Sequence, residues 1–140
     1  MRIWLIDDDE MEHILVEGIL KSLPQAHCLN FFSKIETSLQ TLHTLQADQI
    51  PDLILLDLAL PIHDGFDFLD HFQNENLSLI YPQTQIYILT SSQDRQERSK
   101  AQAYPCVKGV ILKPLLLIQL QTLLLSLEKQ ASEQLALLAQ

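Results

Sequence analysis

A short apolar run, LILL at positions 53–56, ends at a single carboxylate, Asp57. Pro51 precedes the run, and Pro61 and Gly65 close the segment that follows it. Such a run between turn residues predicts a strand that is buried on both faces, as in a parallel sheet. Open α/β sheets place their chemistry at the carboxyl ends of the strands. Asp57 is therefore expected to lie where a site would form.

Apolar runs and helical periodicity extend this pattern along the whole chain. Strands are expected at residues 3–6, 27–32, 52–56, 85–89 and 107–112. Helices are expected at residues 10–23, about 34–45, about 66–72, 94–104 and about 115–138, with Asp8 or Asp9 capping the first and Ser33 the second. Five strands alternating with five helices predict an α/β fold with a doubly wound parallel sheet. Right-handed crossovers favour a flavodoxin-like (βα)5 arrangement with strand order 2-1-3-4-5.

Two helices carry apolar residues whose placement can be predicted. In the first helix the apolar positions are Met11, Ile14, Leu15, Gly18 and Ile19. In the last helix one stripe suits the sheet, and it consists of Leu116, Leu120, Leu123 and Leu127. A second surface is formed by Leu117, Leu124 and Leu125. A helix this apolar either is covered within the monomer or binds a partner, and a homodimer through helix 94–104, strand 107–112 and the last helix is the expected form.

Length and composition limit the possible classes of protein. The 140 residues suit one domain, with residues 1–127 as its body and 128–140 as an extension of the last helix without a separate output domain. The formal net charge of −9 disfavours direct nucleic-acid binding. No segment has the pattern of a signal peptide or a membrane span, so a cytoplasmic protein without membrane contact is expected. Cys28 and Cys106 form no metal-type pair and are expected to be buried, reduced thiols.

Polar residues of particular types terminate four of the predicted strands. Asp7 and Asp8 follow the first strand, Asp57 the third, Thr90 the fourth and Lys113 the fifth. Taken singly, each is an ordinary turn or capping residue. Together they would meet at one edge of a parallel sheet, where crowded carboxylates need a counter-ion such as Mg²⁺. A carboxylate in this setting can attack a phosphoryl group, while a lysine and a hydroxyl stabilise the phosphoryl oxygens.

At this point the sequence resembles the receiver domain of two-component response regulators. The matching segments are LIDDD at 5–9, PDLILLDLALPIHDG at 51–65, ILTSS at 88–92 and GVILKP at 109–114, in the order that the family has them. They extend over residues 1–127, and they look most like small stand-alone receivers. The resemblance implies phosphorylation by a histidine kinase or a histidine phosphotransfer protein, with signalling through altered protein contacts.

The resemblance also implies roles for individual residues. Asp57 would be the phospho-acceptor, while Asp7, Asp8, Asp57 and the backbone oxygen of Ala59 would hold Mg²⁺. Thr90 and Lys113 would bind phosphoryl oxygens, and the peptide bond between Lys113 and Pro114 would be cis, as in relatives.

Three positions depart from what is common in relatives of this family. Val110 stands where many relatives carry an aromatic switch residue, which puts the aromatic part of the switch in doubt. Ala59 and Ser92 are small, so neither side chain is suited to orient an attacking water. We expect the self-catalysed loss of the phosphoryl group to be slow.

Two other functions compete with this one. A phosphatase of the haloacid-dehalogenase type would need an aspartate two residues after Asp57, where this chain has Ala59. A pseudo-receiver would act as a phosphorylation-independent scaffold, although all five expected site residues are present. The histidines show no metal-binding spacing along the sequence: His63 is expected to be an exposed loop residue, and the other four are His13, His27, His43 and His71.

Overall fold

The computed structural model describes residues 1–139 and forms one five-stranded parallel sheet. The strands are β1 (Arg2–Ile6), β2 (Cys28–Phe32), β3 (Leu53–Leu56), β4 (Gln85–Thr90) and β5 (Val107–Leu112). Their order in the sheet is β2-β1-β3-β4-β5, which confirms the flavodoxin-like α/β fold. Gln140, the last residue of the predicted helical extension, lies outside the described residues.

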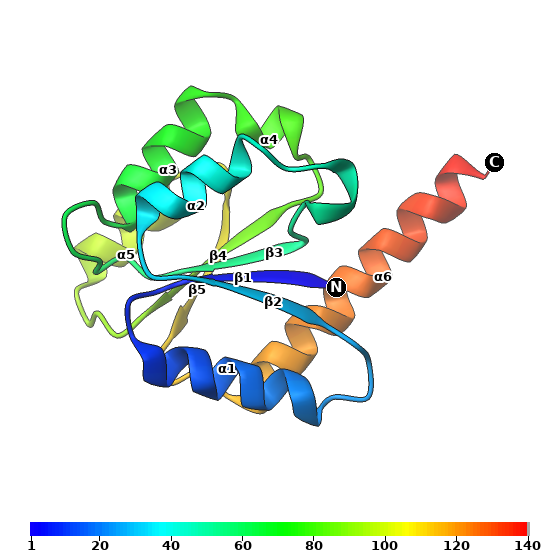
Figure 1. Cartoon of the computed structure of the whole chain (residues 1–140), viewed down its shortest axis with the longest axis horizontal. Helices are drawn as coiled ribbons and strands as arrows, with labels where there is room; N and C mark the ends of the chain where they lie inside the picture. The colour runs from blue at the N-terminus through cyan, green and yellow to red at the C-terminus, as the bar shows by residue number, and fades with distance from the viewer. Residues whose placement is uncertain (140) are drawn as a thin grey trace.

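Helices cover both faces of the sheet (Figure 1). They are α1 (Glu10–Ser22), α2 (Ile35–Leu42), α3 (Gly65–Asn74), α4 (Leu77–Ile80), α5 (Arg95–Gln102) and α6 (Leu117–Leu138). The buried residues of α2, α3, α4 and α5 join one apolar core, and those of α1 and α6 join the other. The four-residue helix α4 and the 3₁₀ turn at Ala47–Gln49 were not predicted, because single turns carry too little periodicity.

β3 is buried along its whole length, because helices pack against both of its faces. Leu53 and Leu55 face the core under α1 and α6, whereas Ile54 and Leu56 face the core under α2 and α3. All four side chains are fully buried. This two-sided burial explains why the sequence shows a continuous apolar run rather than alternation, and it fixes the carboxyl end of β3 in the centre of the sheet edge.

α1 packs on a different face from the predicted one. Met11 and Ile14 are 70% and 60% exposed, whereas Glu12, Val16 and Ile19 are buried. These buried positions follow the spacing i, i+4, i+7, so they lie on one face of the helix, which packs on the sheet and has Glu12 at its first position. Of the predicted apolar positions, Ile19 is buried, but the prediction did not include Glu12 or Val16. Asp9 caps α1 by accepting a hydrogen bond from the backbone N–H of Met11, as one of the two predicted alternatives has it.

α6 also differs from its predicted apolar faces. Leu120, Leu123 and Leu127 are buried as predicted, but Leu116 is 53% exposed because it precedes the first turn of the helix. Leu124 is buried, so it belongs to the core and not to the predicted dimer face. Leu117 and Leu125 of that face are exposed.

Three smaller features complete the fold. The residue preceding α2 is Lys34, which makes no side-chain capping bond, so the prediction of a Ser33 cap was wrong. Cys28 lies exposed on the edge strand β2, and Cys106 is half-buried, so the prediction that both thiols are buried was wrong; both are free. Between residues 1 and 139, no helix has the length and apolar character needed to cross a membrane.

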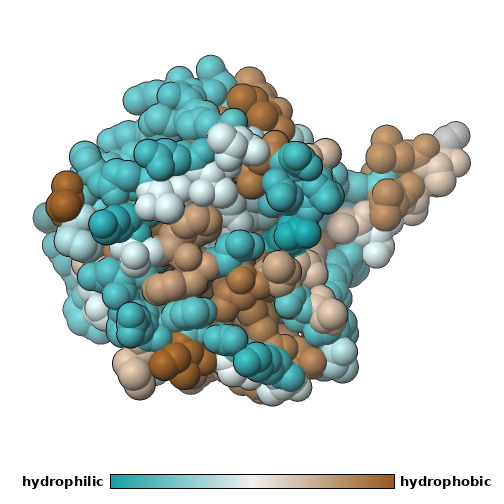
Figure 2. All heavy atoms as spheres, in the orientation of Figure 1, coloured by the Kyte–Doolittle hydropathy of each residue, from teal (hydrophilic) through white to brown (hydrophobic). Residues whose placement is uncertain are grey.

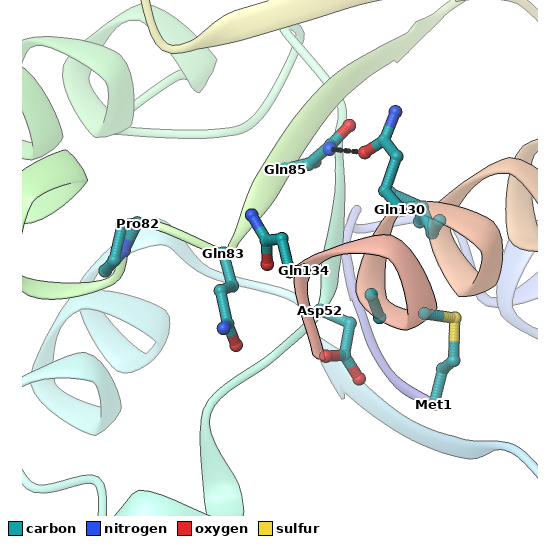
Figure 3. Close-up of a pocket in the computed structure, with 9 residues that line it drawn as sticks. Met1, Asp52, Pro82, Gln83, Gln85, Gln130 and Gln134 are labelled. Carbon is teal, nitrogen blue, oxygen red and sulfur yellow. Dashed lines mark hydrogen bonds between the residues drawn. The ribbon is translucent and has the colours of Figure 1, made fainter. Parts of the chain in front are cut away.

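The carboxyl-terminal part of α6 extends past the amino edge of the sheet and away from the body of the molecule (Figure 1). Where it leaves, Gln130 and Gln134 face Asp52, Gln83 and Gln85 across a small groove (Figure 3). The side chain of Gln85 donates a 2.6 Å hydrogen bond to that of Gln130. Beyond this groove the helix is exposed on all sides, and apolar side chains lie at its end (Figure 2).

Candidate functional site

The backbone hydrogen bonds of the sheet continue one residue beyond the strands at its carboxyl edge. The N–H groups of Asp7 and Asp57 each donate a 2.9 Å bond, to the carbonyls of Phe32 and Ile6 respectively. The N–H of Lys113 donates a 2.8 Å bond to the carbonyl of Thr90. The first residues after these strands are therefore held almost as firmly as the strands themselves, and their side chains are brought to one edge.

Asp7, Asp8 and Asp57 come together as predicted. One carboxylate oxygen from each lies within 4.8 Å of the others. Asp7 and Asp57 are buried, with relative exposures of 0% and 5%, whereas Asp8 is exposed. We call these three residues and Lys113 the acid pocket.

Lys113 supplies the positive charge of the acid pocket. Its Nζ lies 2.7 Å from Asp7 Oδ2, an ion pair without the alignment of a hydrogen bond. It also donates a 3.2 Å hydrogen bond to Asp57 Oδ2. Burial alone would lower the pKa of Lys113, but the two carboxylates outweigh burial and raise it. The ammonium is thus held in its charged form between two buried acids.

Among the carboxyl groups, Asp57 has the most strongly raised pKa. Burial, followed by the charge of Asp7, raises its pKa to about 6, although Lys113 and the backbone N–H of Ala59 oppose the shift. That N–H donates a 3.3 Å bond to Asp57 Oδ1. One ammonium therefore does not fully compensate the clustered carboxylates, and a further cation would be stabilised here.

The loop after β3 leaves little room beside Asp57. The N–H of Gly65 donates to the carbonyl of Leu58, and a Cβ at Gly65 would lie 2.6 Å from the carbonyl oxygen of Asp57. Asp64 caps α3 by accepting a hydrogen bond from Asp67. Ile62, between Pro61 and this cap, has a positive φ of 68° and a side chain that is 90% exposed. The peptide bond between Lys113 and Pro114 is cis.

Thr90 and Val110 lie on the neighbouring strands β4 and β5. Thr90 is buried, and its Oγ1 accepts a 3.1 Å hydrogen bond from the N–H of Ser92. Val110 is half-buried beside a surface pocket that Arg95 and Arg98 of α5 also line. Thr90 belongs to the same sheet edge as the acid pocket, whereas Val110 sits two residues before the end of its strand.

Glu12 is a feature of this region that sequence reasoning missed. It is buried on α1, its Oε1 has no hydrogen-bond partner, and burial is the main cause that raises its pKa. Lys113 opposes this shift, and Asp7 adds to it. The signal was the spacing of Glu12 with Val16 and Ile19, which marks it as a member of the buried face of α1.

Comparison with known proteins identifies this arrangement. A family model described as the response regulator receiver domain matches residues 3–125. A search of curated protein sequences found no match.

Solved structures with the same fold were found. The signal receiver domain of an HD domain-containing protein from Pseudomonas fluorescens Pf-5 is 27% identical, with a TM-score of 0.75 over 95% of this chain and 90% of that one. The Mn²⁺-bound response regulator Rcp1 is 26% identical, with a TM-score of 0.68 over 86% and 87%. A two-component response regulator from Cytophaga hutchinsonii shares the fold at 23% identity, with a TM-score of 0.80 over 91% and 96%.

Proposed function

Because the chain belongs to the response regulator receiver domain family, we propose that it is a signalling module in which Asp57 accepts a phosphoryl group. The observation that carries this proposal is the position of Lys113 Nζ, within 3.2 Å of both Asp7 and Asp57 beside three clustered carboxylates. The donor would be a histidine kinase, the partner class that two-component signalling implies, or a histidine phosphotransfer protein. The receiver is thus a phospho-acceptor rather than an enzyme with a turnover substrate.

In the proposed transfer, a carboxylate oxygen of Asp57 forms a bond to phosphorus as the bond from phosphorus to the donor imidazole breaks. The leaving imidazole takes up a proton from water. Lys113 would pair with a phosphoryl oxygen in place of the Asp57 carboxylate that it now contacts. The hydroxyl of Thr90, at the same edge, would donate to another phosphoryl oxygen.

The acid pocket suits Mg²⁺ as a cofactor. Its donors are oxygens only, from Asp7, Asp8, Asp57 and the backbone carbonyl of Ala59, and hard divalent cations prefer such donors. Asp7 Oδ2 is buried and makes no hydrogen bond, and its charged partner in the fold is the ammonium of Lys113, 2.7 Å away. When bound, Mg²⁺ would neutralise the carboxylates and the phosphoryl oxygens. The similar Rcp1 was crystallised with Mn²⁺.

Several features set the expected behaviour of the phosphorylated form. Ala59 has no polar side-chain atom, and the hydroxyl of Ser92 accepts a hydrogen bond from the N–H of Asp94. Neither side chain has a carboxylate or amide group that could orient an attacking water molecule, which supports slow loss of the phosphoryl group. Val110 has no ring to reorient, so the change in partner contacts would come from Thr90 and its loop.

We further propose that the partner-binding face includes α5, β5 and α6, and that a second copy of the chain binds there. Tyr87, Ile111 and Ile118 line an open apolar groove on this side of the molecule. Leu117 and Leu125, 46% and 51% exposed, lie on the same helix. Residues 1–127 would form the receiver body, with 128–140 as a helical extension, and the free thiols suit a cytoplasmic setting.

The test of phosphorylation uses the full-length chain with acetyl phosphate in the presence and absence of Mg²⁺. We expect a mass gain of one phosphoryl group that requires Mg²⁺ and a change in the fluorescence of the buried Trp4 on β1. Asp57→Asn should abolish the gain, whereas Asp67→Asn, an exposed acid of α3, should not. A folded wild-type protein that gains no mass under any condition would overturn the proposal and favour the phosphorylation-independent scaffold.

A further inference from the structure

Three metal-ligating side chains gather at the end of α3 that lies away from the acid pocket. His43 directly follows α2, His71 lies in the last turn of α3, and Glu75 directly follows α3. The two Nε2 atoms of the histidines are 3.1 Å apart. Glu75 Oε2 lies 3.3 Å from His43 Nε2, and Glu75 Oε1 lies 3.2 Å from His71 Nε2. We call these residues the His–His–Glu cluster.

These distances match the spacing of ligands around one small cation. A tetrahedral Zn²⁺ with bonds of about 2.05 Å places its ligand atoms about 3.3 Å apart, since a tetrahedron's edge is about 1.63 times its bond length. The two Nε2 atoms are 3.1 Å apart, and each lies 3.2–3.3 Å from a carboxylate oxygen of Glu75, Oε1 for His71 and Oε2 for His43; all three separations are close to that value. Both imidazoles also present the same ring nitrogen, Nε2, toward the shared point.

The backbone holds this arrangement in place. Leu42, next to His43, and Phe72, next to His71, are each 1% exposed and anchor the ends of α2 and α3 in the core. The hydroxyl of Tyr81 donates a 2.6 Å hydrogen bond to the carbonyl of Leu42. His71 and Glu75 are four residues apart, and the N–H of Glu75 donates a 3.0 Å hydrogen bond to the carbonyl of His71, so the end of α3 sets their mutual position.

We propose that the His–His–Glu cluster binds Zn²⁺. Two imidazoles and one carboxylate form a set of three protein ligands that suits zinc and leaves a fourth position for water or another donor. The three side chains are 45%, 32% and 45% exposed, so the ion can enter from solvent and the fourth position faces outward. A bound ion would join the carboxyl-terminal ends of α2 and α3.

This site differs chemically from the acid pocket. The acid pocket offers only oxygen donors, which favour Mg²⁺, whereas imidazole nitrogen favours zinc and its neighbours in the first transition row. The two ions can therefore be supplied together and distinguished. In the absence of an ion, the three side chains can also hold one another by hydrogen bonds, and the experiment separates that state from metal binding.

The test measures Zn²⁺ binding to the full-length chain, without a polyhistidine tag, by competition with a chromophoric chelator in excess Mg²⁺. We expect one Zn²⁺ per chain at the cluster, and a rise in melting temperature on zinc addition. His43→Gln and His71→Gln should each weaken this binding by about 100-fold or more, since even losing a residue that only orients a ligand costs 10–100-fold. His63→Gln is the matched control, because His63 is an exposed histidine that also contacts two carboxylates.

A second measurement needs no variant. Addition of Zn²⁺ to the wild-type protein should shift the imidazole ¹⁵N resonances of His43 and His71 together, with saturation at one equivalent, and leave those of His63 unchanged. The proposal is overturned if the wild type binds no Zn²⁺ in the micromolar range, or if binding persists unchanged in both cluster variants. It is equally overturned if the ring resonances of His43 and His71 do not respond.

Discussion

Asp57 carries a negative charge that the metal-free fold accommodates poorly. Its pKa is raised to about 6, chiefly by burial and by Asp7, so the folded state keeps a proton on Asp57 up to a higher pH than the unfolded chain does. A group whose pKa rises on folding stabilises the fold below its unfolded pKa, and this contribution is lost as the pH rises through the folded pKa. For Asp57, the loss takes place between about pH 4 and about pH 6.

Asp57→Asn should therefore stabilise the metal-free protein near neutral pH. We expect the free energy of unfolding to rise by about 1–3 kcal/mol, and the gain to vanish below about pH 4. Urea unfolding over a pH series in the presence of a chelator measures both effects. Mg²⁺ should stabilise the wild type more than the variant, and Asp8→Asn, at the exposed member of the pocket, should have a smaller effect. A variant that is less stable than the wild type at every pH would contradict this account.

Ile62 has a backbone conformation that β-branched residues rarely adopt. Its φ of 68° costs about 1 kcal/mol or more for such a side chain, and 90% exposure means that packing does not repay the cost. Ile62→Asn should raise the free energy of unfolding by about 1 kcal/mol, because asparagine tolerates the left-handed region. Chemical denaturation provides the measurement. Leu79→Asn, at an exposed leucine in α4, should give no comparable gain.

At the scale of elements, the connection between β3 and α3 determines where Asp57 points. A methyl group at Gly65 would lie 2.6 Å from the carbonyl oxygen of Asp57 and 2.9 Å from Cα of Leu58. Both are backbone atoms, so the loop itself would have to move. The geometry of the acid pocket thus depends on a residue without a side chain.

The two glycines that lie in helices should respond in opposite directions to alanine. Gly65→Ala should lower the free energy of unfolding by about 1–3 kcal/mol and slow phosphorylation by acetyl phosphate, since it displaces Asp57. Gly18→Ala, exposed on α1 with no atom near its added Cβ, should raise stability by up to about 1 kcal/mol and leave phosphorylation unchanged. Thermal unfolding measures the change in stability of each variant, and the rate of phosphorylation by acetyl phosphate measures the change at Asp57. Equal effects from the two substitutions would refute the loop argument.

The sequence predicts elements well where the apolar period is unambiguous. β3 reads directly from LILL at 53–56, and the strand ends at Asp7, Asp57 and Lys113 follow from the runs that precede them. α1 is the instructive failure, because its sequence has apolar residues on more than one side and the buried side includes Glu12. Periodicity favours the most apolar face, but the neighbouring Lys113 lowers the cost of burying the charge of Glu12, which burial and Asp7 increase.

Contacts between separate elements are predictable only when a topology rule brings them together. The acid pocket follows such a rule, since the carboxyl ends of parallel strands share an edge. The His–His–Glu cluster follows none: His43 and His71 are 28 positions apart, and their meeting depends on how α2 and α3 pack. For the same reason, sequence spacing alone assigned Leu124 to the surface, although α6 is rotated so that Leu124 enters the core.

For the whole molecule, the apolar groove lined by Tyr87, Ile111 and Ile118 leads to a prediction about oligomeric state. If a second copy binds across α5, β5 and α6, light scattering should give the mass of two chains, and Leu125→Glu should reduce it to one. Ile118, Thr122 and Leu125 follow the spacing i, i+4, i+7, so this substitution places a charge beside the groove. Met11→Glu on α1 is the control, because Met11 is also exposed, at 70% against 51% for Leu125, but lies on another element. A monomeric mass at all concentrations, with and without phosphorylation, would refute the dimer.

Because α6 is long, a small rotation of the helix near the acid pocket produces a larger displacement at its other end. The helix begins four residues after Lys113 and has 22 residues, about 33 Å at 1.5 Å per residue. A tilt of about 5° at its base would carry its free end through about 3 Å. A change in the position of Lys113 on phosphorylation that tilts α6 would therefore displace the end of the helix, beyond the opposite edge of the sheet, more than its beginning. A spin label at each end of α6 would detect the difference between the two displacements.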